Sequence, residues 1–267
     1  AGIPLFLLPI IWKFLPESII FMVKADKQEQ ARHVLTRLAP EANVTATTPL
    51  ELSKAEVPES ATVANLFKKG RATNTLLFWL AFFMCLLTMY ALGSWMPKLM
   101  MAAGYSMGSS LLFLLAMNIG AVIGTVSGGM LADRFHLKPV IMVLGVVGAI
   151  VLSLLGFEPP QVALYLMIAL AGAASIGSQI LLYSYVAQYY PVAVRSTGIG
   201  WASAVGRSGA IIGPILIGML LGMDLPHQYN FIAVGIPLLV VAIAVTLISK
   251  QDQAEEVEVK TAAVARN

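Results

Sequence analysis

Long apolar runs separated by short polar connections dominate the chain after residue 74. Six of them follow one another, at about residues 75–97, 107–132, 138–157, 161–188, 198–222 and 229–249. A run of about 18 or more apolar residues can cross the roughly 30 Å hydrocarbon core of a bilayer as a helix. In lipid every backbone amide must bond within its own helix or in a closed barrel, so runs of this length exclude strands. The pattern predicts an all-α, polytopic membrane protein with a six-helix bundle at residues 75–249.

The rest of the chain divides into three segments. Residues 1–12 are apolar from the first residue and lack the basic start of a signal peptide, so we interpret them as the end of a transmembrane helix whose beginning is missing. Residues 13–74 are polar and predict a linker, in which helical spacing of apolar residues favours a surface helix over residues 28–38. Residues 250–267 form a polar tail.

Composition supports a membrane protein and argues against other classes. Hydrophobic residues make up 58% of the chain and charged residues only 12%, against roughly 25% charged in an ordinary soluble domain. The net charge of +3 comes from bases that lie between apolar runs, whereas a nucleic-acid site needs a basic face, so no nucleic-acid partner is expected. Cys85 is the only cysteine, which excludes an intrachain disulfide and a metal cluster built from thiolates.

Basic residues in the connections predict the orientation, because cytoplasmic loops are enriched in Lys and Arg. They gather in alternate connections: the linker, the second-to-third connection with Arg134 and Lys138, the fourth-to-fifth with Arg195, and the tail. Among the bases, the opposite connections hold only Lys98. We therefore expect a multi-pass membrane protein with a cytoplasmic linker and C-terminus. Six complete spans fit half of a twelve-helix protein whose other half comes first.

Arg207 is the most informative single residue. It lies about ten positions into the fifth run, roughly 15 Å from its start. A guanidinium at that depth costs roughly 2.5–3.5 kcal/mol on insertion scales, so such a residue usually faces a cavity and pairs with an anion. None of the fourteen Asp and Glu residues lies near the middle of a run. The partner is then a carboxylate of the missing half or of a substrate, which the planar fork of Arg matches in two parallel hydrogen bonds. A purely structural pair is the alternative.

Other polar and aromatic residues within the runs are candidates to complete a substrate pocket: Tyr90, Asn118, Gln179, Tyr183 and Trp201. For each of them the alternative role is a hydrogen-bonded packing residue or an interfacial anchor.

Small residues at four-residue spacing predict close helix packing. They occur at Gly120, Gly124 and Gly128 in the second run, and at Gly209 and Gly213 in the fifth. A glycine at each of these points lets a neighbouring helix approach closely.

Asp133 and Arg134 directly follow the second run and precede a very short basic turn to the third. Charge-assisted hydrogen bonds from these residues would form a latch between helix ends. The alternative is a solvated helix end that follows the positive-inside rule. The residues themselves do not decide between the two.

Three sequence motifs resemble those of the major facilitator superfamily. They are Gly129-Met130-Leu131-Ala132-Asp133-Arg134 with Lys138 and Pro139, Leu15-Pro16-Glu17-Ser18, and the Pro-x-x-x-Arg-x-x-Gly-x-Gly passage from Pro191 to Gly200. Their order and the number of runs between them match that family over nearly the whole chain, up to about Lys250. The segments Gly206–Gly213 and Ser94–Pro97 look most like the bacterial aromatic acid:proton symporters.

The resemblance implies the end of helix 6 and the C-terminal bundle, helices 7 to 12, of a twelve-helix transporter. It implies uptake of an aromatic carboxylate such as benzoate or hydroxybenzoate with protons, by alternating access between two six-helix bundles. It also implies cytoplasmic gating contacts from Asp133, Arg134, Lys138 and Arg195, and a cavity-facing Arg207. The family's proton-coupling acids belong to the first helix of the missing half, and no cofactor beyond the proton gradient is expected.

Other functions stay open at this point. A sugar, polyol or other organic-acid carrier would share the same loop motifs, since a fold does not choose its substrate. A truncated, non-transporting membrane protein is a further alternative. A membrane enzyme is disfavoured, because no Ser-His-Asp or metal-ligand spacing is visible and no catalytic residue or metal site is predicted.

Overall fold

The computed structural model describes residues 22, 27–38, 62–68, 70–157, 159–223 and 225–249. The chain forms two compact units, residues 1–59 and 60–267. In the first unit, helix α3 (Gln28–Leu38) confirms the helix expected within the linker. The expected helix end at residues 1–12, the motif at residues 15–18 and the tail at residues 250–267 lie outside the described residues.

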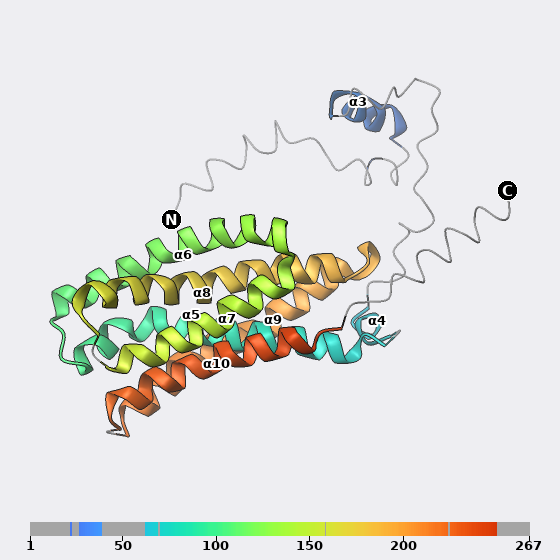
Figure 1. Cartoon of the computed structure of the whole chain (residues 1–267). Coiled ribbons are helices and arrows are strands. Elements are labelled where there is room, and N and C mark those ends of the chain that lie inside the picture. The colour runs from blue at the N-terminus through green and yellow to red at the C-terminus, as the bar shows by residue number, and fades with distance from the viewer. Residues whose placement is uncertain are drawn as a thin grey trace. The chain divides into compact units, whose positions relative to one another are not determined.

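Six long helices make up the second unit and confirm the predicted all-α membrane architecture (Figure 1). Each of them is long and apolar enough to cross a bilayer. They are α5 (Ala72–Ala102), α6 (Met107–Phe135), α7 (Leu137–Leu154), α8 (Gln161–Tyr189), α9 (Val192–Leu221) and α10 (His227–Leu247). A short helix, α4 (Ala64–Phe67), precedes α5, and a 3-10 turn, η3 (Leu155–Phe157), ends α7.

The helices extend beyond the apolar runs at several ends, most of all at the start of α9. The apolar run starts at residue 198, but the helix begins at Val192, directly after Pro191 in an extended conformation with φ −55° and ψ 152°. A proline just before a helix fixes the chain direction and needs no backbone donor. Arg207 therefore lies fifteen positions into the helix, about 22 Å from its start, and its place about ten positions into the apolar run is unchanged.

Close backbone packing at glycines joins two helix pairs. A Cβ at Gly120 of α6 would lie 1.9 Å from the carbonyl oxygen of Ala169 in α8, and one at Gly172 would lie 2.0 Å from that of Met117 in α6. A Cβ at Gly209 of α9 would lie 2.2 Å from the Phe83 carbonyl oxygen in α5. The predicted close packing is confirmed at Gly120, Gly124, Gly209 and Gly213. At Gly128 the nearest neighbour is the end of a side chain, Leu181 Cδ1, at 3.3 Å from such a Cβ.

Two apolar clusters fill the bundle, one toward each end. The first surrounds Phe78, Leu182 and Val245, and the second surrounds Met96, Phe113 and Phe231. We call the end of the bundle that carries Arg71, Arg134, Lys138 and Arg195 the basic end. Helices α5, α7 and α9 begin there, and α6, α8 and α10 end there.

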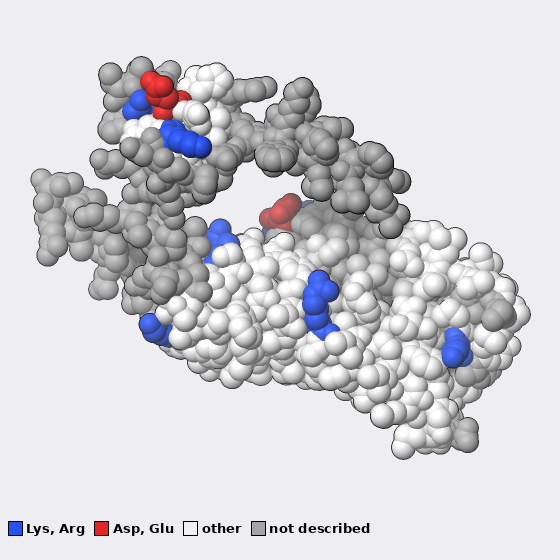
Figure 2. Space-filling view, turned by 180° about the vertical axis from the view of Figure 1, so that it is seen from behind, with Lys and Arg blue, Asp and Glu red and all other residues white. Residues whose placement is uncertain are grey.

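Helices α6 and α9 are the least covered by the bundle. The most apolar windows of their spans are 33% and 22% buried, whereas at least half of the corresponding window is buried in the other four. The uncovered side chains are largely apolar, such as Val122 and Val126 of α6 and Ile211 and Ile215 of α9. Figure 2 shows a bundle surface with only a few separate charged residues. Such a surface suits lipid or further apolar helices rather than water.

Candidate functional site

Arg207 lies midway along α9, beside the strip of small residues that packs on α5. At the adjacent position, a Cβ on Gly206 would lie 2.7 Å from Leu86 Cδ1 and 3.2 Å from the Phe82 carbonyl oxygen. Arg207 itself is exposed. Within the described part of the chain, its guanidinium has no hydrogen-bond or ion-pair partner. A charge placed this deep in an apolar helix needs an anion or water beside it.

A hydrogen bond between α8 and α9 fixes which residues lie near Arg207. The hydroxyls of Tyr183 and Ser203 are 3.0 Å apart. Arg207 follows Ser203 by four residues, and Gln179 precedes Tyr183 by four, so each lies one turn along its helix on the same side. Because α8 runs toward the basic end and α9 away from it, Gln179 and Arg207 lie at similar depth on neighbouring helices.

Gln179 is buried, with 5% of its surface exposed. Among the residues that the structure describes, neither its Nε2 nor its Oε1 has a hydrogen-bond partner. One turn away on the same side of α8, the carbonyl of Ser175 accepts a hydrogen bond from the Cys85 thiol of α5 at 3.2 Å. The amide therefore lies where α8 packs on α5. An unsatisfied buried polar group destabilises a folded protein by about 1–3 kcal/mol.

Aromatic side chains lie beside this region. The rings of Phe82 in α5 and Tyr183 in α8 pack edge to face, with centroids 4.9 Å apart. Tyr90 of α5 is 43% exposed. It lies one turn beyond Leu86, the residue that Gly206 contacts. Tyr90, Tyr183, Gln179 and Arg207 thus come from three helices that meet near the middle of the bundle.

Two of the predicted pocket residues lie elsewhere. Trp201 stacks on Trp79 of α5, with ring centroids 5.8 Å apart and planes 22° apart. It precedes Arg207 by six residues and so projects from a different side of α9. Asn118 is exposed, and its amide donates to the Leu114 carbonyl of its own helix at 2.8 Å. The structure does not bring these two together with Arg207.

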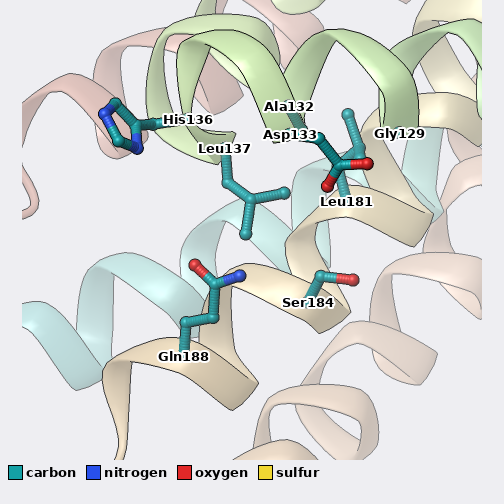
Figure 3. Close-up of a pocket in the computed structure, with 8 residues that line it drawn as sticks. All are labelled: Gly129, Ala132, Asp133, His136, Leu137, Leu181, Ser184 and Gln188. Atoms are coloured by element: carbon teal, nitrogen blue, oxygen red, sulfur yellow. The ribbon is translucent and has the colours of Figure 1, made fainter.

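A cavity of about 340 Å³ opens at the basic end, between α6, the start of α7 and α8. Its lining consists of Gly129, Ala132, Asp133, His136, Leu137, Leu181, Ser184 and Gln188. Figure 3 shows the Asp133 carboxylate directed toward α8 and the Gln188 side chain directed toward Leu137. Asp133 is exposed. Its carboxylate is therefore available to a donor from outside the bundle.

A single residue, His136, joins α6 to α7. Its backbone has φ 69° and ψ 157°, a region that only glycine adopts without strain. This sharp turn places Lys138 at the start of α7. The Lys138 Nζ donates to the carbonyls of Thr246 at 3.0 Å and Ile248 at 2.7 Å, at the end of α10. Lys138 thus satisfies carbonyls that a helix end leaves without partners.

The other predicted gating residues make local contacts. Arg195 Nε donates to the Tyr190 carbonyl at 3.3 Å. The Arg134 guanidinium lies 5.4 Å from the ring centroid of Phe135. The Arg195 bond spans only the short connection between the end of α8 and the start of α9, and the Arg134 contact stays within the end of α6.

Sequence reasoning missed a polar network at the basic end. The Asn74 amide donates to the Tyr189 hydroxyl at 2.7 Å and to the Ser249 carbonyl at 3.2 Å. The hydroxyls of Thr75 and Tyr190 are 2.7 Å apart. Burial raises the pKa of Tyr190, although the Thr75 hydrogen bond opposes the shift. The network ties together α5, α8 and the segment after α10. The signal of this network in the sequence is the pair of polar residues Asn74 and Thr75 at the start of the first apolar run.

Comparison with known proteins adds an independent line of support. The model of the Major Facilitator Superfamily matches residues 78–265. The benzoate transport protein of Acinetobacter baylyi is 48% identical over 93% of this chain and 54% of its own length. The gentisate transporter of Corynebacterium glutamicum is 43% identical over 64% of this chain and 38% of its own length. The 4-hydroxybenzoate transporter PcaK of Pseudomonas aeruginosa is 31% identical over 92% of this chain and 55% of its own length.

Solved structures agree with the fold. The transporter FucP, crystallised in the outward conformation, superposes with a TM-score of 0.63 at 15% identity, over 87% of this chain and 56% of that one. The chain therefore spans about half the length of the relatives it matches. The three relatives named above are transporters rather than enzymes.

Proposed function

The chain belongs to the Major Facilitator Superfamily, and from that premise we propose that it is the second half of a twelve-helix secondary transporter that takes up an aromatic carboxylate such as benzoate or a hydroxybenzoate. Its six spans make it part of a multi-pass membrane protein. Support for the substrate class comes from the relatives named for benzoate, gentisate and 4-hydroxybenzoate.

Arg207 is the observation that carries the proposal. A guanidinium is the best match for a carboxylate, because its two parallel N–H groups bind both oxygens at once. The charge lies deep in an apolar helix, is exposed from this bundle and has no partner among the described residues. A bound carboxylate would neutralise it, and release of that carboxylate would leave a charge that favours the next binding event.

Neighbouring side chains are suited to the rest of such a substrate. The half-buried ring of Tyr183, which packs on the fully buried ring of Phe82, offers an aromatic surface against which a benzene ring packs favourably. The amide of Gln179 in α8 lies at a similar depth to Arg207, and the hydroxyl of Tyr90 in α5 lies farther from the basic end. Both are polar groups on the helices that neighbour α9. In this proposal Arg207 binds the carboxylate, and Tyr90, Gln179 and Tyr183 contact the ring.

Proton coupling and alternating access complete the proposed mechanism. No acidic residue lies midway along a span of this chain, so the proton-coupling carboxylates are assigned to the other six-helix half. No cofactor is needed in this proposal, because the proton gradient drives the alternate opening of the substrate site to the two sides of the membrane. The uncovered faces of α6 and α9 are the surfaces proposed to meet the other half.

The basic end is proposed to face the cytoplasm of the cell inner membrane, as the positive-inside rule predicts. Asp133, at the cavity of the basic end, is proposed to accept a charge-assisted bond from the other half when the cytoplasmic side closes. Arg134 and Arg195 are proposed to contribute to the same closure. Lys138 is proposed to contribute as well, and its hydrogen bonds to the end of α10 also hold the ends of α7 and α10 together.

Uptake assays with the twelve-helix transporter that contains this chain test the proposal. Cells expressing it receive labelled benzoate, 4-hydroxybenzoate, a hexose or a polyol, with and without a protonophore that collapses the proton gradient. Saturable uptake of the aromatic acids alone, abolished by the protonophore, is the expected result. Uptake of the hexose or polyol instead would contradict the substrate class, and uptake of none would favour a non-transporting protein.

A further inference from the structure

The unpartnered amide of Gln179 points to a second recognition element in the proposed substrate site. Its Nε2 and Oε1 are both buried, and within the described part of the chain both lack a hydrogen-bond partner. Almost all buried polar groups in proteins have a hydrogen-bond partner, so an unpartnered one needs an explanation, and a bound guest is one that suits a transporter. The amide therefore marks a position that a bound molecule is expected to serve.

The position of Gln179 relates it to the same guest as Arg207. The Tyr183–Ser203 hydrogen bond joins α8 and α9 one turn nearer the basic end. Gln179 and Arg207 both lie one turn beyond that bond, at similar depth on the two helices. Gln179 lies on the side of α8 that meets α5, next to the ring pair of Phe82 and Tyr183. A planar aromatic ring whose carboxylate is bound by Arg207 would lie against Tyr183, the half-buried member of this pair.

The chemistry of the amide selects the group that it recognises. Nε2 donates and Oε1 accepts, so the preferred partner carries both a proton and lone pairs. A carboxylate accepts only, and Arg207 already satisfies it. A phenolic hydroxyl can accept from Nε2 or donate to Oε1.

We infer that Gln179 recognises a hydroxyl group on the ring of the bound aromatic acid and is a specificity-determining residue of the transporter. The inference rests on the proposed function. A site built to hydrogen-bond a hydroxyl discriminates against an analogue that lacks it, because the site's buried polar group is then left unpaired. Hydroxylated benzoates are therefore preferred over benzoate itself.

The test compares uptake of benzoate, 3-hydroxybenzoate and 4-hydroxybenzoate by the twelve-helix transporter and its variants. Gln179→Leu and Gln179→Met remove the amide, and Met keeps an unbranched side chain of similar length. Ser178→Ala is the matched control, because the Ser178 hydroxyl is the neighbouring buried polar atom and also lacks a partner. Both Gln179 variants replace an unpartnered amide by an apolar group, so the transporter should stay folded, as size-exclusion chromatography would verify.

The expected result is a loss of affinity on the order of tenfold for at least one hydroxybenzoate in both Gln179 variants. The affinity for benzoate should stay within about twofold, and Ser178→Ala should change neither. Equal losses for all three acids would show a structural role and overturn the inference, as would an unchanged preference. In either case the wild-type transporter still carries aromatic acids, so the proposed function survives. A wild type that carries none of the three contradicts both.

Discussion

Replacement of Gly120 by Ala tests the closest helix contact in the bundle. A Cβ at this position would lie 1.9 Å from the carbonyl oxygen of Ala169 in α8. Real Cβ atoms essentially never approach another heavy atom closer than 3.0 Å. Helix α6 must therefore move by about 1 Å or more, and the obstacle is backbone, which cannot turn aside as a side chain can.

The size of the effect follows from two opposing terms. Overpacking a well-packed contact destabilises a protein by about 1–3 kcal/mol. Replacing Gly by Ala inside a helix stabilises it by about 1 kcal/mol through backbone propensity. Gly129→Ala, on the same helix, isolates the second term, because no atom lies within 4 Å of a Cβ there. Gly120→Ala should be less stable than Gly129→Ala by about 1–3 kcal/mol.

Thermal unfolding of the purified transporter in detergent, followed by a thiol-reactive dye or by loss of the monomer peak, measures the difference. The dye can report unfolding because Cys85 is buried in the folded chain. Gly120→Ala should melt several degrees below Gly129→Ala, which should melt at or above the wild type. Equal melting temperatures for the two variants would refute the backbone-to-backbone packing of α6 on α8.

Two further predictions concern the basic end. Lys138→Met removes the donor to the Thr246 and Ile248 carbonyls and should lower the free energy of unfolding by about 1.5–3 kcal/mol, the typical contribution of hydrogen bonds to charged groups. The control Arg134→Met, at an exposed position, should lower it clearly less. Equal losses in melting temperature for the two variants would count against the contact with α10. His136→Gly should raise the melting temperature, since it relieves a backbone strain of about 1–3 kcal/mol at φ 69°. His136→Ala, which keeps the Cβ, should not, so a rise shared by both variants would contradict the strain.

The fold could be predicted from the sequence because the bilayer imposes a simple requirement. Each span must be long and apolar, and both properties can be seen directly in the sequence. The ends of the helices could not be predicted as well. At α9, Pro191 starts the helix six residues before the apolar run, and backbone hydrogen bonding rather than apolarity decides where a helix begins.

The candidate site was predictable only in part. Arg207 stands out because a charge in an apolar run is costly wherever it points. Helical periodicity alone places Trp201 and Arg207 on different sides of α9, so the sequence already argues against a pocket that contains both. The separation of Asn118 from Arg207 and the lack of a partner for the Gln179 amide depend on how neighbouring helices pack, which the sequence does not show. So does the contact of Asn74 with Ser249, 175 positions along the chain.

Uptake of labelled benzoate and 4-hydroxybenzoate by Arg207→Ala and Arg207→Lys transporters tests the central claim most directly. Ser208→Ala is the control, because Ser208 is an exposed neighbour whose hydroxyl donates to the Val205 carbonyl of its own helix. We expect Arg207→Ala to lose uptake by at least about tenfold, and Arg207→Lys to recover little of it because an ammonium lacks the planar fork. Ser208→Ala should transport normally. Unchanged uptake of both acids in both Arg207 variants would contradict a carboxylate-binding role for this residue.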